Sequence, residues 1–314
     1  MIEVAELSKS YGTALAVDEV SFTVRPGAVT AFVGPNGAGK STVLRITLGL
    51  DFADSGSVLI QGRPYRKLDV PTRRVGALLD AGAAHPAQTG RMHLRILAQA
   101  AALPPERVNR VLAQVGLESA AGKRVRTYSL GMRQRLGIAA ALLGEPDVLI
   151  LDEPTNGLDP EGISWFQDLL RSYAADGRAV LISSHHMSEL EETADRVVVI
   201  AAGRIVADAQ LSELVHGPGA PTMRVQTPDA AELQEAVEKG GGSSALAEGC
   251  EDADGPAVFV DVRGVSRTAL AELFLQAQIR VLGLAPVRTS LQDAYAGLTA
   301  DLEKYRSTEG MAQR

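Results

Sequence analysis

Cysteine is almost missing from this chain, because Cys250 is the only one among its 314 residues. A single thiol excludes a disulfide within the chain and a cysteine cluster for zinc. Long apolar runs are missing as well, since no stretch approaches the roughly 18 to 20 apolar residues that cross a membrane as a helix. Any role at a membrane must therefore come through a partner.

Positive charge is in deficit too, because 31 Lys and Arg stand against 38 Asp and Glu and leave a net charge of −7. An acidic balance argues against broad binding to nucleic acid. The N-terminus carries Glu3 and Glu6 where a signal peptide would need a positive start and an apolar run. We therefore expect a cytoplasmic protein with no nucleic-acid partner, long enough for one large domain and a smaller one.

One glycine-rich segment carries most of the chemical information. It reads GPNGAGKST and directly follows an apolar run, residues 29–33, that is typical of a strand. Its glycines allow a tight turn with successive N–H groups pointing inward, and a helix opening near Lys40 adds its positive dipole end. The alternative is a glycine-rich turn without a ligand. The pattern predicts a site for a nucleoside triphosphate at Gly34, Pro35, Asn36, Gly37, Ala38, Gly39, Lys40, Ser41 and Thr42.

Three side chains of this loop have separate expected roles. Lys40 would reach the β- and γ-phosphates, Ser41 would give its hydroxyl to Mg²⁺, and Thr42 would lie near the α- and β-phosphates.

A second segment, DVLILDEP at residues 147–154, predicts an apolar strand that ends in two carboxylates. Ligands bind at the carboxyl ends of parallel strands. Adjacent strand residues point in opposite directions, so we expect Asp152 to join Ser41 around Mg²⁺ and Glu153 to orient or deprotonate the attacking water. The alternative is an acidic pair that only ends a strand.

The order of patterns predicts two domains. Residues 2–24 alternate as an antiparallel strand layer, and helix-favouring residues fill a subdomain at about 76–145. Strand and helix then take turns from residue 147 to the strands VVVIA and RIVADA, which predicts a parallel sheet. A break at HGPGAPT, residues 216–222, divides an expected first domain, 1–216, from a small α+β domain, 217–314.

Within the second domain we expect strands at 222–227, 257–262 and 279–285, helices at 230–239, 266–278 and 290–306, and a flexible segment at 240–244. Ser266 would cap its helix, and Ser290 with Asp293 has a near-capping-box spacing. This domain could stabilise the subunit or regulate its pairing.

Five motifs in order give the chain a family resemblance: GPNGAGKST, YSLGMRQRL (128–136), LILDEP (149–154), NGLDP (156–160) and SSHH (183–186). The chain resembles the ATP-binding subunit of ABC transporters. SLQDAY, residues 290–295, is similar to the tail of subunits that serve ABC-2 type exporters, including the antibiotic-resistance group.

The resemblance implies an α/β fold: a P-loop NTPase core with an N-terminal antiparallel β layer, an inserted α-helical subdomain and the small C-terminal α+β domain. It implies an ATPase with ATP and Mg²⁺ as cofactors that forms a head-to-tail homodimer around two ATP molecules. The partner would be an ABC-2 type membrane permease on a separate chain, exporting a drug-like or other small molecule. The subunit would lie on the inner face of the cell membrane.

The family's functional residues carry over at five positions. Ser129 and the N–H of Gly131 would bind the γ-phosphate of the partner's ATP, with a plain helix cap as the alternative for Ser129. Asp159 would line the dimer seam, or be an ordinary turn aspartate. His185 would contact the γ-phosphate and hold the water, whereas its neighbour His186 is more typical of a buried core histidine. Tyr11 would stack on adenine, or only pack in the strand layer.

Two positions depart from the family. The usual signature reads leucine-serine-glycine-glycine-glutamine, whereas residues 128–132 read YSLGM, so that Met132 cannot supply the final amide. The family's glutamine at the end of VGALLDAG is replaced by Asp80, which could still bind Mg²⁺ but adds negative charge beside the γ-phosphate. In the family this glutamine contacts Mg²⁺ and relays the nucleotide state to the membrane partner. Gln88 is an alternative residue for that role.

Two other functions compete with transport. Soluble ATPases of the same class act on ribosomes or DNA, but their two nucleotide domains in one chain or long coiled coils are not seen here. A P-loop kinase would leave YSLGMRQRL unexplained.

Overall fold

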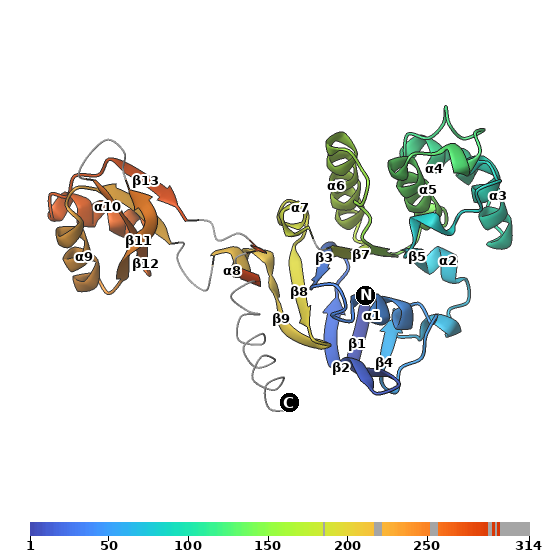
Figure 1. Cartoon of the computed structure of the whole chain (residues 1–314), viewed down its shortest axis with the longest axis horizontal. Helices are drawn as coiled ribbons and strands as arrows, with labels where there is room; N and C mark the ends of the chain where they lie inside the picture. The colour runs from blue at the N-terminus through green and yellow to red at the C-terminus, as the bar shows by residue number, and fades with distance from the viewer. Residues whose placement is uncertain (185, 217–221, 252–256, 288–290, 293, 296–314) are drawn as a thin grey trace, which may run out of the picture. The chain divides into compact units, whose positions relative to one another are not determined.

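The computed structural model describes residues 1–184, 186–216, 222–251, 257–287, 291, 292, 294 and 295. The chain forms two compact units, one built mainly from Met1–Gln210 and the other from Leu211–Ala294. Figure 1 labels their helices and strands. No helix in the described part of the chain is long and apolar enough to cross a bilayer.

The first unit contains two sheets. The smaller has the order β2-β1-β4 and is antiparallel, as expected from the alternating N-terminal residues; its strands are β1 (Ile2–Tyr11), β2 (Ala14–Val24) and β4 (Ser55–Ile60). The larger has the order β5-β6-β7-β3-β8-β9. Its strands are β3 (Ala28–Val33), β5 (Val75–Leu78), β6 (Val148–Asp152), β7 (Ala179–Ser184), β8 (Arg196–Ala201) and β9 (Arg204–Gln210).

One strand of the larger sheet corrects the sequence prediction. β5, β6, β7, β3 and β8 are parallel, but β9 pairs antiparallel with β8. The cause is the two-residue connection, in which Ala202 (φ 52°) and Gly203 (φ 83°) both lie in the left-handed region. Such a connection matches the twist of a hairpin, and it is too short for the crossover that a parallel pair needs.

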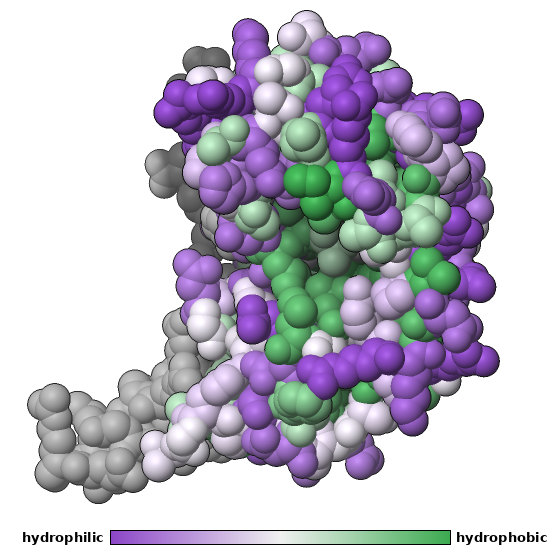
Figure 2. Space-filling view, turned by 90° about the vertical axis from the view of Figure 1, so that its right-hand side faces the viewer, coloured by the Kyte–Doolittle hydropathy of each residue, from purple (hydrophilic) through white to green (hydrophobic). Residues whose placement is uncertain are grey.

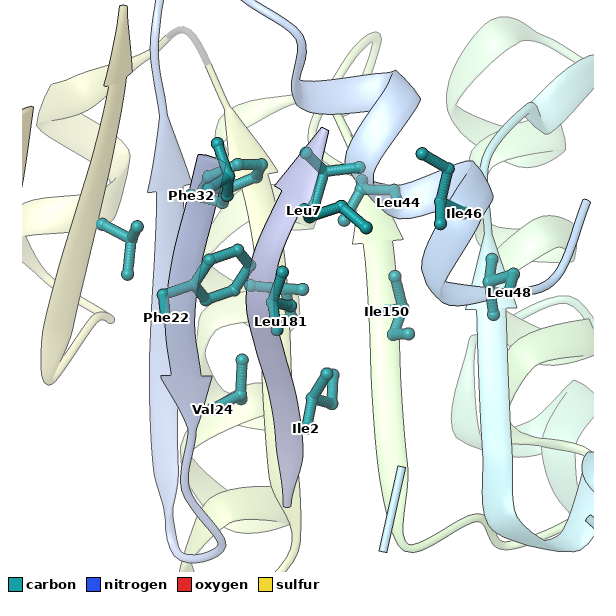
Figure 3. Close-up of a cluster of buried hydrophobic side chains, with 14 of the residues drawn as sticks. Ile2, Leu7, Phe22, Val24, Phe32, Leu44, Ile46, Leu48, Ile150 and Leu181 are labelled. Carbon is teal, nitrogen blue, oxygen red and sulfur yellow. The ribbon is translucent and has the colours of Figure 1, made fainter. Parts of the chain in front are cut away.

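A hydrophobic core lies between the two sheets and around helix α1 (Lys40–Thr47) (Figure 3). Phe22 of β2 and Phe32 of β3 stack at 5.1 Å between ring centroids. Ile150 and Leu181 come from β6 and β7 in the larger sheet. The core therefore fixes the strands whose ends carry the phosphate loop and the two carboxylates.

The inserted helical subdomain is present. Its helices gather in one group in Figure 1: α3 (Gly90–Ala100), α4 (Glu106–Gln114) and α5 (Leu130–Leu142). α2 (Pro71–Arg74) precedes β5, whereas α6 (Pro160–Ala175) and α7 (Met187–Glu191) flank β7 in the sequence.

Within its described residues, the second unit contains an antiparallel sheet with the order β11-β12-β10-β13, in a β-α-β-β-α-β arrangement that follows one further short helix. After α8 (Leu211–His216) come β10 (Met223–Thr227), α9 (Ala230–Lys239), β11 (Ser243–Glu251), β12 (Val258–Arg263), α10 (Arg267–Gln276) and β13 (Gly283–Pro286). Met223, Val225 and Thr227 alternate as buried residues on β10, which places them on the helix-covered face.

Two local predictions for this unit need correction. The segment 240–244 was expected to be flexible, but β11 already begins at Ser243, and SSALAEGCE gave no clear strand signal because it has no β-branched aliphatic residue. The strand expected at 279–285 is shorter and later, at Gly283–Pro286. Ser266 does cap α10, by accepting a hydrogen bond from the N–H of Ala269. Ser290, Asp293 and most of the helix expected at 290–306 lie outside the described residues.

Candidate nucleotide-binding and hydrolysis site

The glycine-rich segment forms a tight turn between β3 and α1. Gly39 precedes α1 with φ of 107°, and a Cβ there would lie 2.6 Å from the carbonyl oxygen of Ala16. Gly34 has no room for a Cβ because the backbone of Ile200 is too close, and Gly37 has φ of 79°. The glycines are therefore required by backbone conformation and close packing.

Lys40 is held inside this turn. Its side chain donates hydrogen bonds to the carbonyl oxygens of Gly34 at 2.6 Å and Pro35 at 3.2 Å, and only 6% of the residue is exposed. Burial lowers the pKa of the Lys40 ammonium, while the negative charges of Glu153 and Asp152 oppose that shift. A buried ammonium in a glycine-rich turn before a helix favours an anionic ligand.

Asp152 connects three separate segments. Its Oδ2 accepts a hydrogen bond from Ser41 Oγ at 2.9 Å, and its Oδ1 accepts one from Ser183 Oγ. Asp152 ends β6 and is paired in register with Ser183 on the neighbouring β7. The carboxylate is thus fixed beside the first turn of α1.

Glu153 follows at the point where the chain leaves β6. Its backbone lies in the left-handed region with φ of 49°, and its N–H donates to the carbonyl oxygen of Ser183 at 3.2 Å. Glu153 and Asp152 line a cavity of about 230 Å³ together with the phosphate-loop residues; the lining is Ala16, Asn36, Gly37, Gly39, Lys40, Ser41, Thr42, Asp152 and Glu153. The structure therefore brings the loop and both carboxylates to one hollow.

The donor set suits Mg²⁺. Ser41 Oγ and Asp152 Oδ2 are hard oxygen atoms 2.9 Å apart. Mg²⁺ in phosphate-transfer sites usually keeps several waters and binds one or two protein oxygens plus the phosphates. Within the described residues, no group of three or more His, Cys, Asp or Glu side chains is placed to hold a metal ion. The geometry fits a magnesium ion shared with a triphosphate rather than a site made by protein alone.

Asp80 lies after β5 in a neighbouring cavity. Its carboxylate accepts the N–H of Gly82 at 2.6 Å. This cavity has a volume of about 570 Å³ and includes Asp80, Asp152, Glu153 and the side chains of Arg126, Arg133 and Gln134 in its lining. Gln88, the alternative relay, accepts the N–H of Val125 through its backbone carbonyl at 2.8 Å.

Tyr11 is the last residue of β1. The residue is 48% exposed, and its hydroxyl donates a hydrogen bond to Asp51. That hydrogen bond is the main cause that raises the pKa of Tyr11. The Lys9 ammonium lies 5.4 Å from the ring centroid. A ring with this much exposed surface could still receive a base.

Ser129 and Asp159 each cap a helix, which realises the plain-cap alternative for Ser129 and gives Asp159 a capping role that the sequence did not predict. Ser129 Oγ accepts the N–H of Met132 at 3.2 Å at the start of α5, and Asp159 accepts the N–H of Gly162 at 2.8 Å at the start of α6. Leu130, in place of a family glycine, is 53% exposed. The Ser129 hydroxyl accepts only one of the N–H groups at the start of α5. The cap is therefore compatible with a phosphate, bound to a second copy of the chain, that contacts the other N–H groups.

The signature segment also packs on the loop after β6. A Cβ on Gly131 would lie 2.7 Å from the carbonyl oxygen of Gly157. A Cβ on Gly157, which has φ of 80°, would overlap the Leu130 side chain. The Leu130 side chain, which replaces a glycine of the family signature, thus fits only because position 157 is a glycine.

The predicted histidine pair is only partly described. His185 lies outside the described residues. His186 is exposed and its N–H donates to Ser184 Oγ at 2.9 Å, so the prediction that it is a buried core histidine is wrong. The physical reason is that β7 ends at Ser184, and the chain has left the sheet before it reaches His186.

Two residues near the carboxylates were not singled out from the sequence. Ser183 binds Asp152 and the N–H of Glu153, and Gln134 donates to the carbonyl oxygen of Glu153 at 3.2 Å. Both lie inside quoted motifs, SSHH and YSLGMRQRL. Their partners are fixed only by the lateral order of the strands and the direction of α5, which the motifs do not specify.

A strand, a glycine-rich phosphate loop and a helix on a mostly parallel sheet define a P-loop nucleoside triphosphatase. A profile of the protein family described as ABC transporter matches residues 17–156. The Streptococcus pyogenes "Lantibiotic transport ATP-binding protein SrtF" is 36% identical over 210 residues, which is 67% of this chain and 91% of the relative. The Enterococcus faecalis "Bacitracin transport ATP-binding protein BcrA" is 38% identical over 217 residues, 68% of this chain and 70% of the relative.

A solved structure, "Structure of ATP binding subunit of ABC transporter", superimposes with a TM-score of 0.63 and 30% identity over 68% of this chain and 91% of that one. The chain belongs to the ATP-binding subunits of ABC transporters. It is an ATPase whose hydrolysis of ATP is coupled to transport, and the reading as a ribosomal ATPase is not supported.

Proposed function

We propose that this chain hydrolyses Mg²⁺-ATP through Lys40, Ser41, Asp152 and Glu153, in a head-to-tail homodimer that drives an ABC-2 type export permease. The observation that carries the proposal is the hydrogen bond between Ser41 and Asp152 in a cavity that Glu153 and the buried Lys40 also line. Bound Mg²⁺ would neutralise charge on the β- and γ-phosphates.

The residues of the loop would first bind the triphosphate. The Lys40 side chain is already held in place by two carbonyl oxygens, so little reorganisation is needed when phosphate oxygens replace part of these contacts. Ser41 and Asp152 would share the metal, and Asp152 is kept in orientation by Ser183. The aromatic face of Tyr11 would support the adenine, because the ring is half exposed while its hydroxyl is anchored to Asp51.

Glu153 would then orient the attacking water and accept its proton. The backbone N–H and carbonyl of Glu153 are both held by hydrogen bonds, and Glu153 lines both of the cavities described above. His185 is proposed to hold the same water, on the basis of the family motif. Asp80 is proposed as a contact to the metal through water, because it lines the same larger cavity as Asp152 and Glu153.

The second copy would complete each site. Ser129 and the N–H of Gly131 would reach the γ-phosphate of its ATP, because α5 begins there and its N-cap, Ser129, and its first residue, Leu130, are exposed. Asp159 would lie at the dimer seam. The two relatives quoted above, named for lantibiotic and bacitracin transport, support an export role for a drug-like compound.

An apolar groove supports docking to a permease at the inner face of the membrane. It has a volume of about 670 Å³ and lies between α2, the end of α3 and the end of α5. Figure 2 shows this side of the molecule, where hydrophobic residues gather in a hollow between two more polar lobes. Apolar patches of this kind mark binding surfaces for other proteins.

The hydrolysis step is tested with Glu153→Gln in the full chain. We expect turnover to fall by about 10²- to 10⁴-fold, the usual range for a lost general base, while ATP still binds and an ATP-bound dimer accumulates. Lys40→Ala should instead abolish ATP binding. Turnover at the wild-type rate in the Glu153→Gln variant would remove the proposed base.

The partner is tested by affinity capture of the tagged full chain from gently solubilised membranes of its source, with and without ATP. A multi-span permease in the capture supports the proposal. Recovery only with ribosomes or DNA from the soluble fraction would contradict it.

A further inference from the structure

Glu153 has an unfavourable backbone conformation for a residue with a side chain. Its φ of 49° lies in the left-handed region, which L-residues other than glycine rarely adopt. Residues in such conformations persist only when their surroundings hold them, and they often occur at functional sites. Whatever holds this backbone therefore also controls where the carboxylate points.

Ser183 on β7 holds one side of Glu153. The N–H of Glu153 donates to the carbonyl oxygen of Ser183 at 3.2 Å and lies 3.1 Å from its Oγ. The same Ser183 hydroxyl donates to Asp152. The N–H of Glu153 is therefore held by a residue of the larger sheet.

Gln134 on α5 holds the other side. Its Nε2 donates to the carbonyl oxygen of Glu153 at 3.2 Å, and Gln134 is only 3% exposed. That carbonyl also accepts the N–H of Asn156 at 3.3 Å, which closes the turn after β6. A buried N–H of a side-chain amide costs free energy when it has no acceptor, so this hydrogen bond is strongly favoured.

The helix that carries Gln134 also carries the signature residues. α5 starts at Leu130, and its residue Gly131 packs directly on the carbonyl of Gly157. Residues of α5 therefore contact both ends of the loop from Glu153 to Gly157. A shift of α5 would move the backbone of Glu153 with it.

We propose that Gln134 is a positioning residue that holds Glu153 in its hydrolytic orientation and couples this orientation to the placement of α5. The inference rests on the proposed role of Glu153 as the base. Gln134 acts through the Glu153 backbone, so its loss affects the rate of hydrolysis rather than nucleotide binding.

The test is Gln134→Met in the full chain, because methionine keeps the unbranched shape but lacks the amide donor. We expect kcat to fall by about 10- to 100-fold, as for misplaced catalytic groups, with KM and the Kd for ATP changed less than about twofold. Gln167→Met is the matched control. Gln167 is also a buried helical glutamine, and it donates to the backbone carbonyl of Glu189 at 3.2 Å.

The outcomes separate the two proposals. A kcat in Gln134→Met within about threefold of wild type, or an equal loss in Gln167→Met, overturns the positioning role. Gln134→Met should add no further loss in a Glu153→Gln background, since the group that it positions is then gone. Wild-type turnover in Glu153→Gln alone would instead overturn the proposed base, whatever Gln134 does. If Gln134→Met does not fold, Gln134→Leu gives the same comparison, because leucine is uncharged, suits a buried position and has no donor.

Discussion

Ser41 and Asp152 are 111 residues apart in sequence, yet their side chains share a hydrogen bond of 2.9 Å. One comes from the first turn of α1 and the other from the end of β6. β7 separates β6 from β3 in the sheet, so the contact crosses a whole strand. Ser183 on that intervening strand binds the other oxygen of Asp152 and keeps the carboxylate directed toward Ser41.

This pair leads to a prediction about metal dependence. Ser41→Ala should raise the free Mg²⁺ concentration needed for half-maximal turnover by at least about tenfold, since one oxygen donor is lost and a tenfold change corresponds to about 1.4 kcal/mol. Ser41→Thr should stay near wild type because it keeps the hydroxyl. The measurement is ATP hydrolysis across a Mg²⁺ titration.

The control for this titration is Ser172→Ala, which removes an exposed hydroxyl from α6 in the same unit. It should leave the Mg²⁺ requirement unchanged. A Ser41→Ala curve that overlays the curve of this control would show that Ser41 is not a metal ligand.

The phosphate loop and the carboxylate strand could be predicted because each is local: a strand, a glycine turn and a helix lie within a few residues. The lateral order of the strands could not, because it depends on pairings such as Asp152 with Ser183 across 31 residues. The direction of β9 was missed because a two-residue turn at Ala202–Gly203 decides it. The contacts of Gln134 and Ser183 could not be predicted either, because the packing of α5 and the order of the strands bring these residues to Glu153 and Asp152.

Asp80 gives a second prediction, about charge. Its carboxylate lines the cavity that also contains Asp152 and Glu153, so it adds negative charge where the γ-phosphate is proposed to lie. Asp80→Gln should lower the KM for Mg²⁺-ATP by about three- to tenfold, because the amide oxygen can keep the proposed water-mediated contact to the metal while the repulsion between like charges is removed. The glutamine can still accept the N–H of Gly82, which Asp80 does now.

Steady-state ATP hydrolysis at low salt measures this effect, and 0.5 M salt should reduce it through screening. Asp168→Asn is the control, because it removes one negative charge from a side chain that is 73% exposed and does not line this cavity. An unchanged or higher KM in Asp80→Gln would show that the charge of Asp80 does not weaken the binding of Mg²⁺-ATP.

The second unit has a pH-sensitive ion pair between Asp229, before α9, and Arg280, before β13. Asp229 accepts hydrogen bonds from the guanidinium and the backbone N–H of Arg280, the latter at 2.9 Å. Chiefly because of the guanidinium contact, the pKa of Asp229 is lowered from 3.8 to about 2. A lowered carboxyl pKa adds stability that is complete above about pH 4 and is lost as the pH falls toward 2.

Asp229→Asn should therefore speed amide hydrogen exchange at Arg280 and along β13 at pH 7, and this difference from wild type should shrink below pH 4 after correction for intrinsic exchange. Glu235→Gln is the control, because the Glu235–Lys239 pair on α9 is 69% and 74% exposed and such pairs contribute little. Mass spectrometry of peptides that cover 279–287 in the full chain gives the measurement. A difference that persists unchanged at pH 3, or equals that of Glu235→Gln, would mean that Asp229 does not hold Arg280 through its charge.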